Sequence, residues 1–401
     1  MRLLFYEMKK SWLRLPILVL AAVFCILNSY KINESYNLTG RFPLPNGIEL
    51  KNAYYQLLDS TFSGKITTEK IEYAVNNYND LSMEIKDGSY STEYDESRLT
   101  GYVYGDYALY HAYIIPEMEY AVTYTNISSE IAKRAYDNIA FFTKHGNFSD
   151  AEKNKIIYRI YKNRQISNYN MTEWVSVYFK YDFSSLLVII MIIIGLANSF
   201  SAESESGMYM LISANRKNKK TAIAKLLSAA LYVLLLTVLF TLADIVTINK
   251  LCRIEGVLNP IYSAQVFEYS PFDFSFLSAI VICSFSKYLA FTVVAKIVMI
   301  ISAIEKNTIL SIGTAFVLCS GLIIAANRSD MPANPINLLT GYDLLNEFDC
   351  VTLFNRTVLT LYVVMIAYIV VIAFLWIATI RLFMCSGRIK SVLIRIKEAA
   401  D

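Results

Sequence analysis

The most informative segment of the chain reads Phe200-Ser-Ala-Glu-Ser-Glu-Ser-Gly-Met-Tyr-Met-Leu-Ile-Ser-Ala-Asn-Arg-Lys-Asn-Lys-Lys220. This polar loop separates two long apolar runs, Leu186–Phe200 and Thr221–Ile248. It opens with acidic residues and closes with four cations, which suits the two ends of a helix dipole. Its apolar residues recur at i, i+3, i+4 spacing: Met208, Leu211 and Ile212. The pattern predicts a short amphipathic helix at a membrane surface.

Two interpretations of this loop remain open from the pattern alone. Its apolar ridge could dock into a groove on a soluble partner, as amphipathic helices do. Alternatively, the segment could lie flat at the interface with its bases against anionic lipid. The N-terminal residues Arg2–Lys10 are also amphipathic and are expected to lie at the same interface.

The composition indicates a membrane protein. The 401 residues are 55% hydrophobic and only 18% charged, and the mean hydropathy is positive, whereas soluble domains average about 25% charged residues. A net charge of +3 and the lack of a basic tract argue against nucleic-acid binding. The two histidines, His111 and His145, are far apart, so we expect no metal site.

The six cysteines contain no CxxC pair, which excludes a metal knuckle and a redox motif. Cys252 and Cys350 fall in two predicted outer loops. They could form a disulfide, and two free thiols are the alternative.

Six apolar runs approach the roughly 20 residues needed to cross a bilayer. They are Trp12–Tyr30, Phe183–Ser201, Thr221–Ile248, Phe274–Ile304, Thr308–Ala326 and Val358–Leu382. The first has the charge pattern of a signal peptide, but no small-x-small cleavage site follows it, so we predict an uncleaved anchor.

The cations beside the spans predict the orientation. They concentrate in the N-terminal tail, the 201–220 loop, the turn at Lys306 and the C-terminal tail. These four segments share the cytoplasmic side if both termini are cytoplasmic. An even number of spans agrees with this, because it places both termini on the same side. The predicted location is the cell membrane, with a multi-pass topology.

The predicted fold class is an all-α membrane protein with six transmembrane helices. A mostly helical extracellular domain, residues 31–182, is inserted between helices 1 and 2. Residues 1–30 hold a flat elbow helix and the first span, and residues 183–401 hold spans 2–6, the cytoplasmic loop at about 201–220 and a basic tail. Within 31–182, Ser149 and Thr67 or Thr68 are predicted helix caps, and a third helix is predicted to run from about Ser128 to Lys144.

No enzyme signature occurs in the sequence. The chain lacks a GxxxxGK[ST] phosphate loop, a GxSxG elbow and an HExxH helix, so no ATP hydrolysis or other catalysis is expected of it. Glu203 and Glu205 are two positions apart on a predicted helix. They therefore do not share a face and do not suit a general acid–base pair.

Ionisable residues within the spans are candidate functional residues, because a charge at membrane depth costs several kcal/mol unless it is paired or hydrated. Asp244 lies near the outer end of the third span, and Lys287 lies in the fourth. Lys287 could line a polar cavity opposite Asp244, or it could snorkel or form a structural ion pair. Lys296 is expected to snorkel, and Lys225 is expected to be an interfacial anchor.

The chain resembles the permease subunits of type-2 ATP-binding-cassette (ABC) exporters. Between spans two and three that family carries Phe-x-x-Glu-x-x-x-Gly, a Leu-rich turn, a basic patch and a Lys that enters the next helix. The matching positions are Phe200, Glu203, Gly207, Leu211-Ile212, Arg216-Lys217 and Lys225. The family's Ile-Ser-Ala-x-x-x-Asn turn occurs at Ile301–Asn307. Asn215 departs from the family pattern, which has Pro or Ser before the Arg.

The resemblance implies that residues about 203–214 form a coupling helix that seats in a separate ATP-binding subunit. The implied coupling residues are Glu203, Glu205, Gly207, Met208, Tyr209, Leu211, Ile212, Arg216 and Lys217. The implied partners are that ATPase, which would hold ATP and Mg, and a second permease chain, identical or homologous. The implied function is ATP-driven export of a peptide, lipid or drug-like substrate, including antimicrobial peptide export or resistance.

Two other functions compete with export by an ABC permease. A membrane-anchored receptor or sensor would bind a ligand through the extracellular domain and use the spans as an anchor. A secondary transporter would work without ATP, but the sequence shows no internal repeat or pair of interrupted helices of the kind such carriers use.

Overall fold

The computed structural model describes residues 2–40, 47–88, 93–169, 172–208, 218–305, 307–328, 334–340, 342–346, 348–353 and 356–398. The chain is 78% helical. Six helices are long and apolar enough to cross a membrane, which indicates a multi-pass membrane protein. Their apolar stretches are Leu15–Leu38, Glu173–Glu205, Lys219–Leu251, Phe276–Ile304, Thr308–Ala326 and Thr360–Phe383. The number of predicted spans is thus confirmed, with shifted boundaries.

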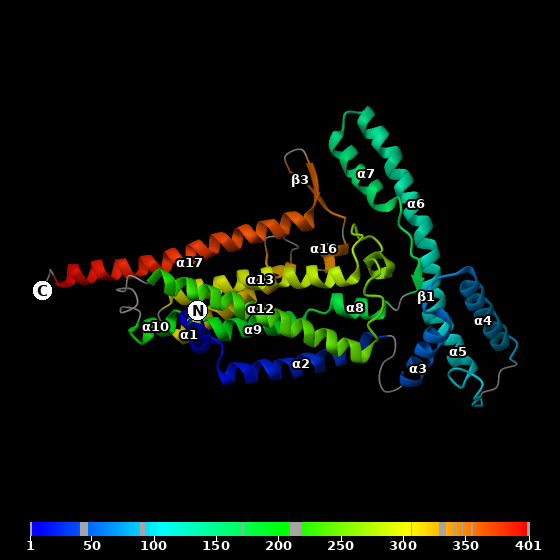
Figure 1. Ribbon diagram of the computed structural model, residues 1–401, viewed down its shortest axis with the longest axis horizontal. Coiled ribbons are helices and arrows are strands. Elements are labelled where there is room, and N and C mark those ends of the chain that lie inside the picture. Colours follow the sequence, from blue (N-terminus) through cyan, green and yellow to red (C-terminus); the bar gives the residue numbers. More distant parts are fainter. Residues whose placement is uncertain are drawn as a thin grey trace.

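The six spans form an elongated bundle, and α13 (Phe276–Ile304) lies at its centre, against α9, α12, α14 and α17 (Figure 1). The other spans are α2 (Leu15–Thr39), α9 (Phe183–Leu196), α12 (Asn218–Leu251), α14 (Thr308–Ala326) and α17 (Thr360–Glu398). Both chain termini lie toward the same end of the bundle, which we call the terminal end.

Local sequence explains where several of these helices begin. Pro16 occupies the first turn of α2, where its missing N–H costs nothing. Ser275 caps α13 by accepting from Ser278 N, and Asn307 caps α14 by accepting from the N–H groups of Ile309 and Leu310. The apolar sequence Phe183–Leu196 has few polar positions on any face, and α9 is accordingly almost entirely buried.

Close approach of two helices in the bundle depends on a glycine. A Cβ added at Gly195 of α9 would lie 2.5 Å from Cε1 of Tyr232 on α12. The Tyr232 hydroxyl donates to Met191 O at 2.9 Å, and its ring stacks on Trp12, with centroids 5.1 Å apart. Tyr232 therefore fills the space between α9 and the segment that joins α1 (Arg2–Ser11) to α2.

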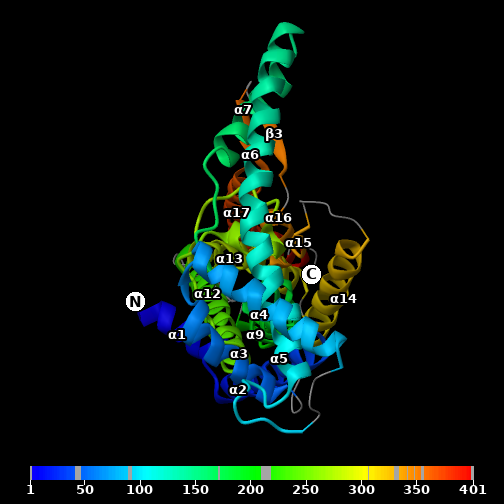
Figure 2. The same cartoon turned by 90° about the vertical axis from the view of Figure 1, so that its right-hand side faces the viewer.

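The opposite end of the bundle carries a helical head, which we define as residues 48–169. Its elements are α3 (Ile48–Leu57), a π-helical turn (Leu58–Phe62), β1 (Gly64–Lys65), α4 (Thr68–Lys86), α5 (Val103–Leu109), a second π-helical turn (Tyr110–Ile114), α6 (Ile115–Lys144), α7 (Phe148–Tyr161) and β2 (Asn168–Tyr169). Figure 2 shows α6 as a long helix standing across the end of the bundle, with α7 packed along it. The predicted mostly helical character of this region is confirmed, while its extracellular location stays a prediction.

The caps predicted for the head are partly right. Thr67 caps α4 by accepting from Lys70 N, as predicted. The prediction of Ser149 for the next helix is wrong, because Asn147 accepts from Asp150 N and α7 begins at Phe148. The helix predicted from Ser128 to Lys144 ends at Lys144 but begins at Ile115, and Gly146 follows it with φ 73°.

The head does not have a core separate from the bundle. One hydrophobic cluster joins its buried residues to the head ends of the spans and to residues 252–276. This cluster includes Ile32 and Tyr36 of α2, Trp174 of α8 (Glu173–Lys180), Ile248 of α12, and Phe267 and Phe276 at and before α13. A second cluster fills the bundle itself.

The segments before α13 and between α14 and α17 form short elements at the head end. Two 3-10 turns, Ile261–Ser263 and Gln265–Phe267, lie before α13. After α14 come α15 (Asn337–Thr340), α16 (Tyr342–Asn346) and an antiparallel hairpin of β3 (Cys350–Leu353) and β4 (Arg356–Leu359), in which Cys350 pairs with Leu359. The strand β1 pairs antiparallel with β2, with Gly64 opposite Tyr169.

Arg164 attaches the head to the segment before α13. Its side chain is only 2% exposed and its Nε donates to Asp273 Oδ1 at 2.8 Å. The guanidinium also donates to Ser270 O at 2.7 Å and Phe272 O at 3.1 Å, and it lies 4.6 Å from the ring centroids of both Tyr161 and Tyr262. Each of the three guanidinium nitrogens therefore donates at least one hydrogen bond, and Asp273 and the two rings offset the buried charge.

Candidate functional site

A cluster of buried charges lies at the terminal end of the bundle, where the 201–220 loop leaves the membrane spans. Lys225 on α12 is 4% exposed and Glu203 on α10 (Ser201–Glu205) is 1% exposed. Lys225 Nζ donates to Glu203 Oε1 at 2.7 Å and to Ser199 O at 2.7 Å, and it lies 5.2 Å from the ring centroid of Phe200. The pair therefore fixes the start of the loop to the start of α12.

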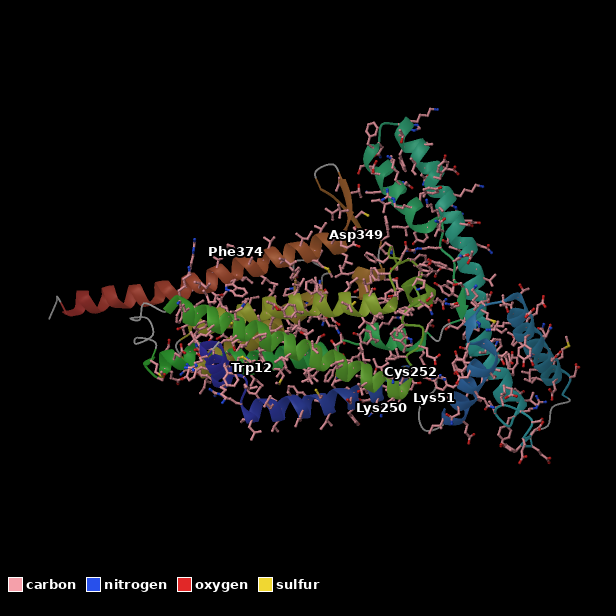
Figure 3. The ribbon with its side chains drawn as sticks, viewed as in Figure 1. Trp12, Lys51, Lys250, Cys252, Asp349 and Phe374 are labelled. Carbon is pink, nitrogen blue, oxygen red and sulfur yellow. The ribbon has the colours of Figure 1, made fainter. Side chains whose placement is uncertain are left out.

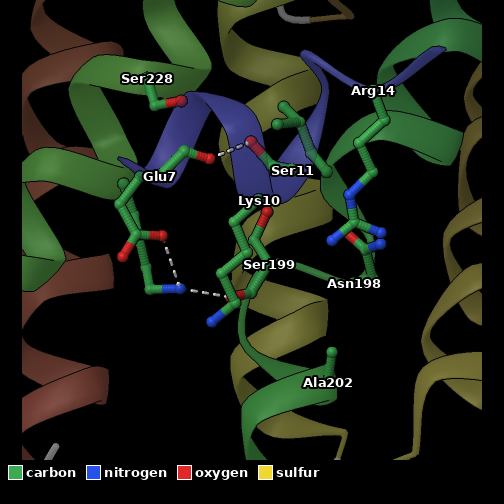
Figure 4. A pocket seen from close by; sticks show the side chains of 10 residues that line it. Glu7, Lys10, Ser11, Arg14, Asn198, Ser199, Ala202 and Ser228 are labelled. Carbon is green, nitrogen blue, oxygen red and sulfur yellow. Dashed lines mark hydrogen bonds and ion pairs between the residues drawn. The ribbon is translucent and has the colours of Figure 1, made fainter. Parts of the chain in front are cut away.

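The N-terminal helix α1 supplies the other half of the cluster. Glu7 is buried and its Oε2 lies 3.2 Å from Lys225 Nζ, while Lys10 Nζ donates to Glu203 Oε1. Two carboxylates and two ammonium groups thus share one site, which balances the charge. Figure 4 shows Glu7, Lys10 and Ser199 around the small cavity between α1 and the α9–α10 turn.

Trp12, just after α1, reinforces this attachment. Its Nε1 donates to Ser228 O at 3.2 Å and to Ser228 Oγ at 3.0 Å, both on α12. The Ser11 hydroxyl caps the same turn by donating to Glu7 O at 2.7 Å. The amphipathic N-terminal helix predicted from sequence is present, and it is held by buried polar contacts as well as by apolar ones.

The start of the loop also contacts the last turn of α13 and the first residue of α14. The N–H groups of Phe200 and Ser201 donate to Ser302 Oγ at 3.0 and 3.1 Å. Glu205 Oε2 accepts from Thr308 Oγ1 at 2.7 Å. Glu203 and Glu205 therefore bind different partners on different elements, in agreement with the prediction that they do not share a face.

The described part of the loop ends soon after these contacts. Gly207 has φ 73°, a left-handed conformation that glycine adopts without strain, and Met208 is 45% exposed. Five of the predicted coupling residues lie outside the described residues: Tyr209, Leu211, Ile212, Arg216 and Lys217. Among the predicted coupling residues that are described, Glu203 and Glu205 anchor the loop and Met208 is available at its surface.

Two predictions about lysines are wrong. Lys225 is a buried ion-pair partner and not an interfacial anchor, because Glu203 and Glu7 enclose it. Lys296 does not snorkel: its side chain is 0% exposed, its Nζ lies 3.4 Å from Leu226 O, and it lies 4.6 Å from the ring centroid of Trp376. A carbonyl and an aromatic face take the place of water for this ammonium.

Asp244 lies buried near the head end of α12. Its Oδ1 accepts from Asn28 Nδ2 of α2 at 2.6 Å and its Oδ2 accepts from Ser184 Oγ of α9 at 2.9 Å. Tyr181 in turn donates to Asn28 Oδ1 at 2.8 Å. Asp244 and Lys287 line the same small cavity, which is one of the alternatives that the sequence left open, without a direct ion pair between them in the described part of the chain.

The structure decides between the two alternatives left open for Cys252 and Cys350. Cys252 and Cys350 are both free thiols, the alternative considered from the sequence. Figure 3 places Cys252 at the end of α12 near Lys51 of the head, whose Nζ donates to Leu251 O. Cys252 is buried in the cluster shared by head and spans, whereas Cys350 is half-buried on β3.

Two larger cavities lie at the head end. One, of about 900 Å³, is lined by α2, α8 and Glu117 of α6, and carries both acidic and basic side chains. The other, of about 510 Å³, is lined by residues of the segments before α13 and between α14 and α17, including Asp343 and Asp349. Asp182 lines both. Within the described residues, no group of three or more His, Cys, Asp or Glu side chains is placed to hold a metal ion.

Comparisons with protein-family models, curated proteins and solved structures find no match to this chain. The candidate site is therefore defined by the contacts within this chain alone. Sequence reasoning identified Glu203 and Lys225 but assigned no role to Glu7 or Arg164. The only sequence signal for Glu7 is an acid within an otherwise basic N-terminal segment, and Arg164 carries no signal of its own.

Proposed function

We propose that this chain is the membrane-spanning permease of an exporter that is driven by a separate ABC-type ATPase. In this proposal the ATPase binds the 201–220 loop from the cytoplasm, where both termini also lie, and the chain itself carries out no bond chemistry. A second permease chain completes the assembly in the cell membrane, and ATP and Mg are held by the ATPase. The substrate is a peptide, a lipid or a drug-like molecule.

The observation that carries this proposal is the attachment of the loop at its base. Glu203 is bound to α12 through Lys225 and to α1 through Lys10, and Glu205 is bound to the start of α14. The hydroxyl of Ser302 on α13 accepts hydrogen bonds from the backbone N–H groups of Phe200 and Ser201. A force applied to the loop would therefore reach four helices at once.

The buried character of these contacts matters for transmission. Exposed ion pairs contribute little and exchange partners easily, whereas pairs enclosed by protein keep one geometry. Rigid-body movement of helices is the usual way in which a small displacement at one site becomes a large one elsewhere. In the proposed cycle, closure of the ATPase displaces α10 and rocks α12 and α13 together.

Co-purification tests the proposal. The full chain, expressed in its native host with an affinity tag, should retain a P-loop ATPase, and the change Leu211→Asp with Ile212→Asp should release it by placing two charges on the docking ridge. The matched control is Met83→Asp with Val75→Asp, which places two charges on exposed positions of α4. ATPase binding and ATP-dependent transport that both survive the loop change would contradict the proposal and favour a receptor or sensor.

A further inference from the structure

A small cavity lies between α9, α12 and α13, toward the head end of the bundle. Six polar side chains line it: Ser184, Ser185, Thr237, Thr241, Asp244 and Lys287. Its volume is about 10 Å³, which is close to the space that one water molecule requires. A polar lining of this kind at a membrane-spanning depth favours an occupant that can form hydrogen bonds.

Two of the lining groups have unused hydrogen-bonding capacity. Ser185 is 4% exposed, and its Oγ has no hydrogen-bond partner among the described residues. Lys287 is half-buried and has no hydrogen-bond or ion-pair partner in the described part of the chain, although it is close enough to Asp244 to interact electrostatically. Asp244 accepts two hydrogen bonds, which leaves acceptor positions on both oxygens.

We infer that this cavity binds one water molecule, which bridges Lys287 to Asp244. The water accepts a hydrogen bond from the Lys287 ammonium and donates to the Asp244 carboxylate and to Ser185 Oγ. These contacts give the water three partners, the usual number for a buried water. The bridge also links the two opposite charges, which have no direct ion pair between them.

The charges in the lining exclude a metal cation as the occupant. The Lys287 ammonium already supplies the positive charge that balances Asp244, and a second cation in a space of this size would repel it. The bridge joins α13 to α12 directly and, through Asn28 and Ser184, to α2 and α9. This inference does not depend on the proposed function.

The test compares two changes that each remove one buried hydroxyl from the full chain in lipid nanodiscs. Ser185→Ala should lower the thermal unfolding midpoint by about 1–2 °C, because the water loses a partner. Thr292→Val is the matched control, since Thr292 Oγ1 is also buried without a partner but does not line this cavity. Thr292→Val should leave the midpoint unchanged or raise it.

An unchanged or higher midpoint for Ser185→Ala, as in the control, would show a dry cavity and overturn the inference. A midpoint that increases with sodium chloride but not with choline chloride, and only when Asp244 is present, would show a bound sodium ion instead and also overturn it. Asp244→Asn and Lys287→Gln should each lower the midpoint, and the double change should lower it by less than their sum. Additive effects would contradict a bridge between the two charges.

Discussion

Arg164 Nε lies 2.8 Å from Asp273 Oδ1, and this contact joins the end of α7 to the segment that leads into α13. Tyr161 and Tyr262 lie close to the same guanidinium. The helical head is therefore attached to the central helix of the bundle by a residue that is 109 positions away from its partner in the sequence. Movement of α13 along the bundle would move the head.

Replacing Arg164 should loosen this attachment. Arg164→Ala leaves Ser270 O and Phe272 O without donors, each at a cost of about 1–3 kcal/mol. Limited proteolysis of the detergent-solubilised chain should then cleave near residues 162–170 at a higher rate. Arg134→Ala on α6, which removes only an exposed pair with Glu130, is the control and should leave the rate unchanged.

The Lys225 cluster should respond strongly to the loss of one charge. Lys225→Met leaves Glu203 and Glu7 buried without a cation close to both, and we expect a loss of about 3–5 kcal/mol in stability. The triple change Lys225→Met, Glu203→Gln, Glu7→Gln should recover most of this loss. Thermal unfolding in nanodiscs measures both; equal instability of the single and triple variants would show that the cluster is not an electrostatic unit.

Trp12 allows the hydrogen bonds to be separated from the ring contact. Trp12→Phe keeps an aromatic ring against Tyr232 but loses the bonds to Ser228, and it should cost about 1 kcal/mol. Trp12→Ala removes the ring as well and should cost about 3–5 kcal/mol. The two variants are compared by denaturant unfolding of the full chain, and equal losses would mean that ring stacking contributes nothing.

The head and the adjoining end of α12 should lose stability at alkaline pH. Burial raises the pKa of Tyr55 from 10.0 to about 12, although the Arg253 N–H that it accepts opposes this rise, and burial raises the pKa of the Cys252 thiol from 9.0 to about 12. The unfolded chain therefore releases these protons at lower pH than the folded chain, so stability is intact below pH 9 and falls between about pH 9 and 12. Unfolding midpoints measured across this range check the slope, and Tyr55→Phe with Cys252→Ser should reduce it.

The free thiols should differ in reactivity. Cys350 is half-buried at the head end and Cys252 is buried, so a membrane-impermeant maleimide should label Cys350 first. Labelling of intact cells also tests the orientation, since it requires that the head end face outward. Cys350→Ser is the control, and it should remove most of the fast labelling. Labelling that appears only after the cells are opened would place the head in the cytoplasm.

Much of the fold follows from local sequence. The spans are predictable because twenty consecutive apolar residues have few alternatives to a membrane helix. A cap at Thr67 or Thr68 is predictable because an amphipathic run follows, and the structure assigns the cap to Thr67. The error at Ser149 arose because Asn147 offers an equally good cap two residues earlier. The predicted first span ends too early, since α2 continues past Tyr30 to Thr39, and Ile32 and Tyr36 of this extension pack in the cluster shared with the head.

The site was less predictable, because it depends on contacts between residues distant in sequence. From position alone, both Lys225 and Lys296 are expected to reach water at the interface. In the structure, Glu7 and Glu203 neutralise Lys225. Leu226 O and the Trp376 ring contact the ammonium of Lys296. A sequence pattern gives the depth of a charge but not its neighbours. Pairing with Glu7 in particular requires that α1 fold back against α12, which no local signal specifies.

The ring of Tyr232 is wedged between Gly195 of α9 and the indole of Trp12. If α9 slides past α12, the Tyr232 ring has to move, and the Trp12 indole and α1 then move with it. The position of residues 2–12 therefore depends on how α9 packs against α12. A fluorophore placed there would report rearrangements that no surface probe on the spans could detect.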